Sequence, residues 1–387
     1  MEKSTLALLA ALVVVVAAVG GAVVLMQDDD NDDGPNTVTD VRGRVVTLPD
    51  EVNRIVCLQA GAARLAVYLD AGDMIVGVDA MDAKVNGPKP LFEHATYRLV
   101  VDTSKAIEMT PATVVEDGKM YNVGGPENYK AIQMTQADII LCTEPEKAKL
   151  DTLQMQTGIP VVGLHAEGNL HVNDSELTEN LRVGGKAVGK EARAEQLIQG
   201  IQDTVHDLEQ KCSKVATDTK QGCYVGGMVS GMQGGFFRTT GNYYAFDLGG
   251  ARNVMPDNGT GNPYDTDVKT VASSGAQYIF VDSIKSVPSQ NQFNEQVAQF
   301  TNLPAIEDDN IYSLYTYKFY GTNWESELLN AYYVGHVLHP EVYGGDAEFK
   351  QSINDVLDLF FPDSGLNFDR MAELQGPGAM KLDWLSQ

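Results

Sequence analysis

Polar side chains follow several short apolar runs in the first half of the chain, at places suited to binding a ligand. In chain order they are Gln59, Arg64, Asp79, Met81, Thr143, Glu144 and His165. If the apolar runs are parallel strands, these residues lie near the strand ends, where open α/β sheets bind ligands. His165 could ligate iron or donate to an oxyanion, although a lone histidine is more often structural. Residues 124–129 form a loop before an expected helix, whose free N–H groups could meet an anion; a plain turn is the alternative.

Two aromatic stretches in the second half of the chain, 236–244 and 312–324, carry polar side chains among their rings. Their candidate ligand-binding residues are Arg238, Thr240, Tyr243, Tyr315, Tyr317, Lys318 and Asn323. Aromatic walls with a few polar groups suit a bulky chelate, but the tyrosines could equally well pack a core. Because a heavily anionic ligand would need more cations, a small oxyanion and a weakly charged chelate both remain open.

The sequence carries no recognisable catalytic constellation. It lacks G-x-S-x-G, H-E-x-x-H and phosphate-loop motifs, and its six histidines are scattered. Four cysteines without C-x-x-C spacing make a zinc site improbable. We therefore expect a binding protein with no cofactor, no bound metal of its own and no enzymatic activity. A chelatase-like enzyme is the least favoured alternative.

The four cysteines fall into two pairs. Cys57 and Cys142 lie in apparent neighbouring strands and are expected to be buried thiols. Cys212 and Cys223 stand at the end of a long helical pattern and the start of the next strand. Outside the cell, a disulfide between Cys212 and Cys223 is one alternative and free thiols are the other.

An apolar segment near the N-terminus predicts where the protein works. Leu6 to Met26 are 21 consecutive residues without charge, and an acidic stretch at 28–33 follows. As a helix the segment would be about 31 Å long, which matches the hydrocarbon core of a bilayer. Only one cation, Lys3, precedes it, so the N-terminus is expected in the cytoplasm and the remainder outside. We expect an uncleaved signal anchor that holds the globular part at the cell surface.

Composition limits both the partners and the architecture. The net charge is −25, from 28 Lys and Arg against 53 Asp and Glu. Such an excess of acidic residues argues against nucleic acid or an anionic membrane surface as a partner. The chain beyond the apolar segment is longer than one hydrophobic core usually serves, so two lobes are expected.

Strands and helices alternate along the first part of the chain. Strands are expected at 54–58, 74–78, 138–142 and 159–164, with a hairpin at 41–49 and a helix at 60–69. Strand, helix and strand at this spacing predict a parallel sheet.

The second part begins with a long helix. Apolar spacing over 191–214 predicts one amphipathic helix about 36 Å long. Strands are then expected at 223–225, 278–282 and 311–314, and helices at 324–338 and 349–361. A helix-to-strand pattern, Lys130, Ile132, Ala137 and Ile140, recurs with the same spacing as Lys269, Val271, Ala276 and Ile279. We therefore predict an α/β fold of two similar Rossmann-like lobes with central parallel sheets, joined by one rigid helix.

Several segments, in this order, resemble the helix-linked periplasmic binding proteins, which deliver iron-siderophore, haem, cobalamin or some oxyanions to ABC importers. The segments are 54–58, 71–79, 137–140, 157–162, 185–194, 240–254 and 330–341. The resemblance runs from about residue 38 to 383. An N-terminal anchor without a lipid-bearing cysteine is more similar to archaeal members than to bacterial ones.

The resemblance implies a ligand held between two lobes and delivered unchanged to an ABC permease dimer and its ATPase. The expected divisions are a signal anchor (1–27), an acidic linker (28–40), an N-terminal lobe (41–174), a linking helical segment (175–215) and a C-terminal lobe (216–387). The expected ligand is a metal chelate, iron-siderophore-like or corrinoid. A molybdate- or tungstate-type oxyanion, or a ligand-sensing surface protein without transport, are the alternatives.

The resemblance also implies where the permease docks. In better-known family members a Glu on the outer surface of each lobe enters an Arg pocket of the permease. The aligned positions here are Lys130 and Lys269, which carry the opposite charge. Glu127 and Asp267 nearby are the alternative docking residues.

Overall fold

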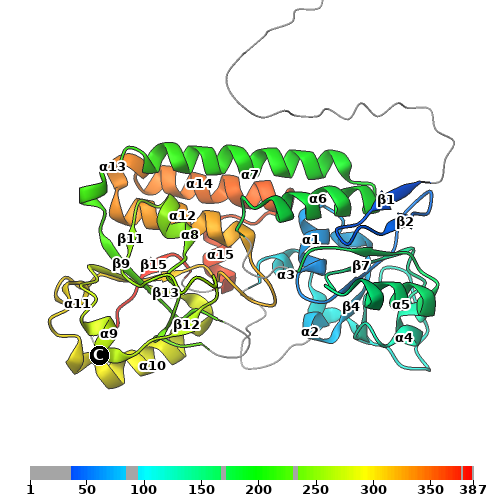
Figure 1. Cartoon of the computed structure of the whole chain (residues 1–387), viewed down its shortest axis with the longest axis horizontal. Helices are drawn as coiled ribbons and strands as arrows, with labels where there is room; N and C mark the ends of the chain where they lie inside the picture. Colours follow the sequence, from blue (N-terminus) through cyan, green and yellow to red (C-terminus); the bar gives the residue numbers. More distant parts are fainter. Residues whose placement is uncertain (1–35, 84–94, 167–170, 230–233, 376–377, 386–387) are drawn as a thin grey trace, which may run out of the picture. The chain divides into compact units, whose positions relative to one another are not determined.

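Two β-sheets, each made mainly of parallel strands, organise the chain (Figure 1). The computed structural model describes residues 36–83, 95–166, 171–229, 234–375 and 378–385. The first sheet has the strand order β5-β6-β4-β3-β7-β8, with every neighbouring pair parallel. Its strands are β3 (Ile55–Leu58), β4 (Ile75–Asp79), β5 (Ile107–Glu108), β6 (Tyr121–Gly124), β7 (Ile139–Cys142) and β8 (Val161–Gly163).

The second sheet has the order β11-β9-β13-β14-β15. Its strands are β9 (Gly222–Gly226), β11 (Arg252–Asn253), β13 (Tyr278–Asp282), β14 (Ile311–Leu314) and β15 (Met380–Lys381). Only β15 runs antiparallel to its neighbour. A separate small ribbon pairs β10 (Arg238–Thr239) with β12 (Tyr264–Asp265).

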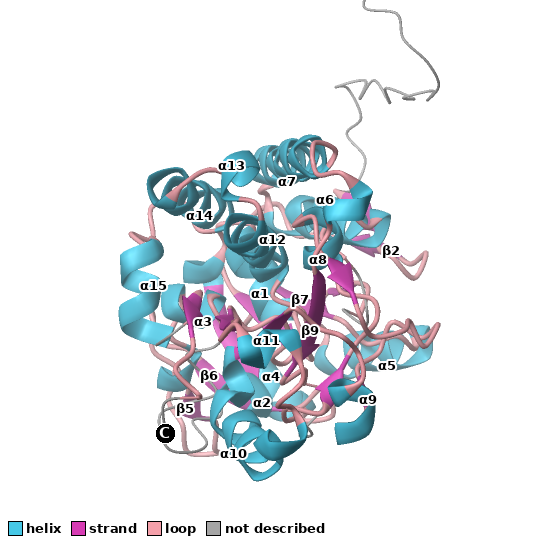
Figure 2. Ribbon diagram, turned by 90° about the vertical axis from the view of Figure 1, so that its left-hand side faces the viewer, coloured by secondary structure: helices cyan, strands magenta, loops and turns pink. Residues whose placement is uncertain are grey.

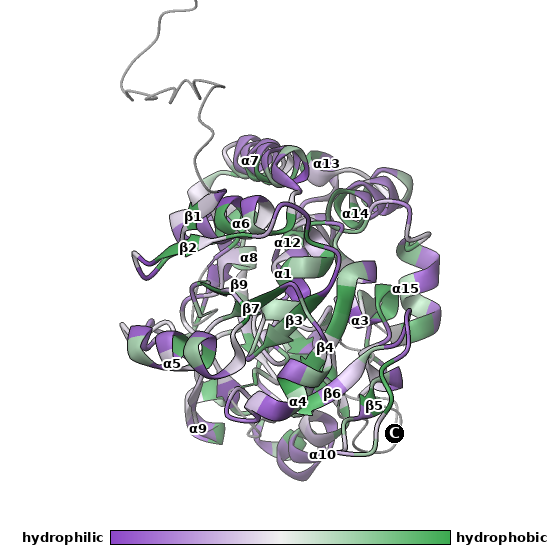
Figure 3. Ribbon diagram, turned by 90° about the vertical axis from the view of Figure 1, so that its right-hand side faces the viewer, coloured by the Kyte–Doolittle hydropathy of each residue, from purple (hydrophilic) through white to green (hydrophobic). Residues whose placement is uncertain are grey.

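The central strands are apolar because helices cover both faces of a parallel sheet. Every residue of β3, β4, β7 and β9 is buried. β3 lies beside β7 with Cys57 opposite Leu141 and Leu58 opposite Cys142, so both expected buried thiols are confirmed. Figure 3 shows hydrophobic residues gathered on these strands and hydrophilic ones on the outer helices.

The expected hairpin exists but starts earlier than 41–49. Its strands are β1 (Thr37–Thr39) and β2 (Val45–Thr47), and the residues expected to open it form the turn between them. Arg44 fixes the hairpin to the first sheet, because its Nη1 donates to Asp40 Oδ2 at 3.0 Å and to Val161 O at 2.8 Å. Its Nε also donates to Asp151 Oδ1 at 2.7 Å and its Nη2 to Gln154 Oε1 at 3.0 Å, so all three nitrogens of the guanidinium help to hold the hairpin.

The long helix between the sheets is present as α7 (Glu191–Cys212), which ends two residues before the expected boundary. The amphipathic character predicted for 191–214 is confirmed, because one buried stripe runs along the helix, made of Ala194, Leu197, Ile198, Ile201, Val205 and Leu208. It packs against α6 (Ser175–Val188) on one side and against α8 (Tyr244–Leu248), α12 (Trp324–Leu338) and α14 (Asp346–Phe360) on the other. One helix thus contacts elements that precede and follow it in the chain (Figure 1).

The remaining helices are short and mostly connect strands. They are α1 (Ala62–Tyr68), α2 (Ala80–Ala83), α3 (Tyr97–Val100), α4 (Tyr129–Met134), α5 (Lys147–Thr157), α9 (Val268–Ala272), α10 (Ser286–Gln296), α11 (Pro304–Glu307), α13 (Pro340–Tyr343) and α15 (Phe368–Gln375). The helices α4 and α9 hold the recurring pattern of the sequence and lead into β7 and β13, respectively. Figures 1 and 2 place α9 and α10 on the side of the molecule away from α7.

Residues 36–387 form one compact unit. The apolar segment 6–26, expected to be a membrane anchor, lies outside the described residues. Among the described helices, none is both long and apolar enough for a bilayer crossing.

Candidate functional site

A carboxylate at the end of β4 collects polar groups from three parts of the chain. Asp79 is 5% exposed, and its Oδ1 accepts from the backbone N–H groups of Met81 at 2.9 Å and Asp82 at 3.0 Å. Its Oδ2 accepts from the Gln59 N–H at 2.7 Å and from the Tyr320 hydroxyl at 2.5 Å. Asp79 therefore joins the ends of β3 and β4 to a loop more than 200 residues away.

A second carboxylate lies at the end of β7, beside the first. The Gln59 Nε2 donates to Glu144 Oε2 at 2.9 Å, and the Glu146 N–H donates to its Oε1 at 3.0 Å. Burial raises the pKa of Glu144, but these hydrogen bonds and the Lys149 ammonium outweigh it, so the pKa lies below its usual value. Glu144 is thus charged at neutral pH. We call Gln59, Asp79 and Glu144 the strand-end cluster.

The loop 318–321, which connects β14 to α12, contacts this cluster. Arg64 is completely buried, and its Nη2 donates to the carbonyls of Phe319 at 2.8 Å and Tyr320 at 3.3 Å. The Arg98 guanidinium lies 5.2 Å from the Phe319 ring centroid and 3.1 Å from the Asp82 carboxylate. Arg64 therefore holds the backbone of this loop, which follows a strand of the second sheet, and Arg98 lies against its Phe319 side chain.

Most of the residues that meet here, but not all, are predicted from the sequence. Gln59, Arg64, Asp79, Met81 and Glu144 were candidates and are brought together by β3, β4, β7 and α1. Tyr320 was missed, although it lies within the aromatic stretch. Its signal was weak, because nothing local distinguishes it from the tyrosines on either side.

The other tyrosine candidates are in the hydrophobic core. Tyr243, Tyr315 and Tyr317 are each less than 5% exposed, and Asn330 bonds the first two through its amide. Burial raises the pKa of all three hydroxyls. These contacts favour the core-packing alternative for these three residues.

The further candidates have partners close to them in the chain or in space. Arg238 pairs with Asp265 at 2.8 Å, and Thr240 Oγ1 accepts from the Asn242 N–H at 3.2 Å. His165 Nε2 lies 2.7 Å from Glu179 on α6. Asn323 is buried and donates to Thr316 O at 2.9 Å, and Lys318 Nζ lies 5.2 Å from the Tyr317 ring centroid. None of these contacts tests ligand binding.

One histidine without a predicted role, His171, has a perturbed pKa. His171 Nδ1 lies 2.7 Å from Glu327 Oε1, and the Val172 N–H donates to the other oxygen at 2.7 Å. Burial lowers the pKa of His171, but the hydrogen bond and charge of Glu327 outweigh it and raise the pKa above its usual value. This pair ties the chain after β8 to the start of α12.

Asp282 ends β13 as Asp79 ends β4. Its Oδ1 accepts from the Ile284 N–H at 3.1 Å, and its Oδ2 accepts from the Tyr317 N–H at 2.8 Å. Burial raises the pKa of Asp282 to about 7, despite these hydrogen bonds. The second sheet therefore repeats the use of a strand-terminal Asp to hold a neighbouring chain segment.

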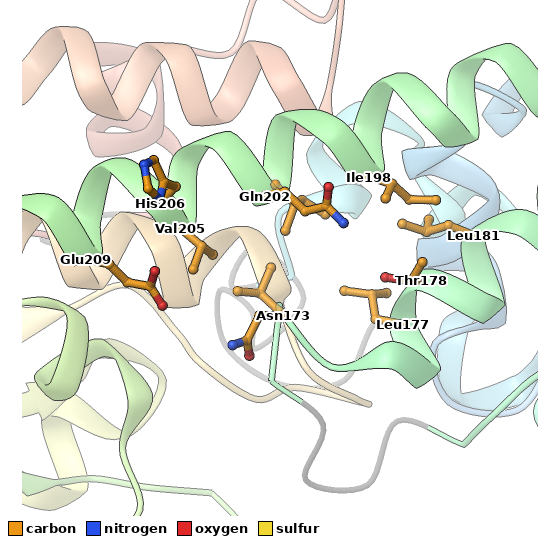
Figure 4. A pocket seen from close by; sticks show the side chains of 11 residues that line it. Asn173, Leu177, Thr178, Leu181, Ile198, Gln202, Val205, His206 and Glu209 are labelled. Carbon is orange, nitrogen blue, oxygen red and sulfur yellow. The ribbon is translucent and has the colours of Figure 1, made fainter. Parts of the chain in front are cut away.

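Cavities lie both away from the strand-end cluster and at its edge. One of about 260 Å³ is bounded by α6, α7 and residues 172–173, with Leu177, Leu181 and Ile198 among its mostly apolar walls (Figure 4). Another of about 100 Å³ lies beneath the loop 124–129 and reaches Glu144. In that loop the Asn128 N–H donates to Gly125 O at 3.0 Å, which closes a turn before α4. The polar groups that meet at the strand-end cluster favour it as the candidate site over the cavity beside α7.

The structure decides between the two alternatives for Cys212 and Cys223. All four cysteines are free, so the disulfide considered for Cys212 and Cys223 is not formed. The Cys212 thiol instead donates to Asp247 O at 3.1 Å, and Cys223 is buried in β9. Among the described residues, no group of three or more His, Cys, Asp or Glu could hold a metal ion.

The residues considered for permease docking are all exposed. Glu127 lies just before α4, Lys130 lies in the first turn of α4, and Lys269 lies in α9. Asp267 has a structural role as well, because its Oδ1 accepts from the N–H groups of Lys269 and Thr270, each at 2.9 Å, and so caps α9. Figures 1 and 3 show α4 and α9 on the side of the molecule away from α7.

Comparison with known proteins yields one family and several similar folds. The model of the family described as periplasmic binding protein matches residues 55–317. An uncharacterized ABC transporter substrate-binding lipoprotein of Bacillus subtilis, YvrC, is 23% identical over 198 residues, which cover 49% of this chain. The chain spans about half the length of that relative (52%).

Solved structures share the fold at low identity. A periplasmic solute binding protein from Veillonella parvula is 16% identical with a TM-score of 0.65, covering 88% of this chain and 97% of its own. The molybdate periplasmic binding protein MolA of Haemophilus influenzae is 19% identical with a TM-score of 0.62, covering 86% of this chain and 99% of its own. At such identities the likeness concerns the fold alone.

Proposed function

Because the chain belongs to the periplasmic binding protein family, we propose that it is the extracellular solute-binding component of an ABC importer. It would capture a metal chelate between two lobes joined by α7 and deliver it, chemically unchanged, to a permease dimer and its ATPase. The strand-end cluster carries this proposal, because it lies where α/β sheets bind ligands and consists of binding groups without a nucleophile and base pair.

The charges of the cluster support a neutral or weakly charged chelate over an oxyanion. Asp79 and Glu144 supply hydrogen-bond acceptors, whereas an oxyanion needs donors. The nearest arginines, Arg64 and Arg98, are buried and bonded to the 319–320 carbonyls and to Asp82. A chelate of iron-siderophore or corrinoid type presents N–H and O–H groups that such acceptors can bind. An oxyanion of molybdate type is the second candidate, favoured only by the fold shared with MolA.

A thermal-shift panel tests the ligand class. Ferric siderophores, haem, cobalamin, molybdate and tungstate would be added separately to the purified protein. A compound present at 100 times its Kd should stabilise the fold by about 2.7 kcal/mol, which gives a clear rise in Tm. A rise with molybdate or tungstate only would contradict the chelate assignment. Recovery of a chemically altered compound after incubation would contradict a non-enzymatic role.

We further propose that residues 6–26 anchor the protein in the cytoplasmic membrane with residues 36–387 outside. The support is the length and apolar character of that segment and the single Lys3 before it. Protease added to intact cells should then remove the globular part, while a peptide containing 6–26 stays with the membrane fraction. Protection of the globular part from the protease would contradict this location.

A further inference from the structure

Resting on the proposed function, we propose that Asp79 is the anchoring acceptor of the ligand site. Tyr320 fills this position until an O–H or N–H group of the ligand replaces its hydroxyl. The ligand class that follows is a neutral or cationic molecule rich in hydrogen-bond donors. The loop 318–321 then acts as a built-in substitute for the ligand.

The four hydrogen bonds accepted by Asp79 are of two kinds. Three come from backbone N–H groups of Gln59, which directly follows β3, and of Met81 and Asp82, in the helix α2 that directly follows β4, and they fix the carboxylate in place. The fourth comes from a side chain on a distant loop, the hydroxyl of Tyr320 at 2.5 Å. Of the four donors, only the Tyr320 hydroxyl can be replaced by a group of the ligand without disturbing the strand ends.

The two residues that donate to Asp79 Oδ2, Gln59 and Tyr320, both have an unfavourable backbone conformation. Tyr320 has φ 47° and Gln59 has φ 68°, in the left-handed region that residues with a Cβ rarely adopt. Such a conformation costs on the order of 1–3 kcal/mol and persists only where surrounding contacts compensate for it. Because both residues donate to the same oxygen of Asp79, their positive φ angles support a functional role for this carboxylate.

The loop backbone is held separately from the tyrosine side chain. Arg64 binds the carbonyls of Phe319 and Tyr320, and Arg98 lies against the Phe319 ring. With the backbone held, the Tyr320 side chain alone can leave Asp79. The exchange therefore needs a rotation of one side chain and no movement of the two sheets.

The chemistry of the site defines what can take the place of Tyr320. Burial and the adjacent Asp79 raise the pKa of the Tyr320 hydroxyl, so it remains a donor. A replacing group must also donate, because Asp79 accepts and Glu144 adds a second negative charge nearby. A carboxylate, phosphate or molybdate oxygen would meet two negative charges there and be repelled.

Chemical rescue tests the acceptor position without a natural ligand. Tyr320→Gly removes the ring and suits the positive φ, and Tyr320→Ala provides a second variant if the first folds poorly. We expect p-cresol, a copy of the lost side chain, to raise the Tm of the variants and not of the wild type. Toluene lacks the hydroxyl and 4-methylbenzoate carries a negative charge, so both should have much smaller effects. Adding Asp79→Asn should abolish the advantage of p-cresol over toluene.

Equal responses to p-cresol and toluene would show a merely apolar hole and overturn the proposal, as would preference for 4-methylbenzoate. A second arm uses whichever compound of the thermal-shift panel binds the wild type. Tyr320→Phe should bind it about tenfold more tightly, because the competing hydroxyl is gone, and Asp79→Asn should weaken it. Unchanged affinity in both variants would show that Asp79 does not contribute to ligand binding and would overturn the proposal. If no compound in the panel binds, that result counts against the proposed function, and the p-cresol arm still decides the acceptor position.

Discussion

At the scale of single residues, Asp282 makes a pH-dependent contribution to stability. Its pKa is raised to about 7 by burial, whereas an unfolded aspartate has a pKa near 3.9. The folded state therefore binds this proton more tightly than the unfolded state. The contribution is complete below about pH 4 and is lost as the pH rises through about 7.

We predict that Asp282→Asn removes this part of the pH dependence. The Asn amide has only one oxygen, so it cannot accept the hydrogen bonds of both the Ile284 and the Tyr317 N–H groups. The free energy of unfolding of the variant should therefore be lower by on the order of 1–3 kcal/mol at low pH, with a smaller difference at pH 8. The measurement is urea unfolding of both proteins at pH 5 and pH 8. A stability difference between wild type and variant that is the same at both pH values would contradict the assignment.

The sequence could identify one side of the candidate site and not the other. Gln59, Asp79 and Glu144 follow apolar runs, and a run of this kind predicts a strand end from local information alone. Tyr320 reaches Asp79 through a loop that leaves another sheet, and no local pattern records that contact. The buried tyrosines were ambiguous for a related reason, since alternation of polar and aromatic residues fits both a core and a binding wall.

At the scale of elements, periodicity predicted most strands and the long helices well. The expected helix 324–338 coincides with α12, and the strand 311–314 with β14. The predicted bounds of the hairpin were wrong, because Asp40 and Arg44 form a hydrogen-bonded turn that an apolar pattern does not reveal. Short helices such as α9 depend on caps and tertiary packing rather than on periodicity.

We predict that Gly335→Ala, within α12, destabilises the protein despite the better helix propensity of alanine. An added Cβ would lie 2.3 Å from the Tyr343 ring, which is 2% exposed and bonded to Leu248 O through its hydroxyl. Overpacking of this kind costs about 1–3 kcal/mol, against about 1 kcal/mol gained in propensity. The change in urea midpoint measures the net loss.

A matched control uses another helix. Gly200→Ala in α7 would place its Cβ 2.3 Å from Leu359 Cδ1, which is the far end of a partly exposed side chain. Because that side chain can turn away, we expect little or no loss of stability. If Gly335→Ala were as stable as Gly200→Ala, close packing of α12 on Tyr343 would not be the reason for glycine there.

At the scale of the whole molecule, we predict that ligand binding causes only a small closure. The single helix α7 packs against helices on both sides of it, and a hinge needs a few residues that are free to change their dihedral angles. The change in radius of gyration by small-angle scattering should be on the order of 1 Å or less, as in other pre-organised complexes. A compaction of several ångströms would contradict a stiff connection.

The last prediction concerns delivery to the permease. Lys130 and Lys269 are exposed on α4 and α9, which both lie away from α7, so one surface could present both lysines (Figure 1). If these lysines dock, the permease should carry acidic residues opposite them, because like charges across an interface cost several kcal/mol. Lys130→Glu combined with Lys269→Glu should then abolish uptake while affinity for the ligand stays unchanged.

A control double variant, Lys186→Glu with Lys214→Glu, makes the same charge change at exposed positions in α6 and just after α7, and it should transport normally. Normal uptake by the first double variant would exclude the lysines and return the role to Glu127 and Asp267, although Asp267 is already engaged in capping α9.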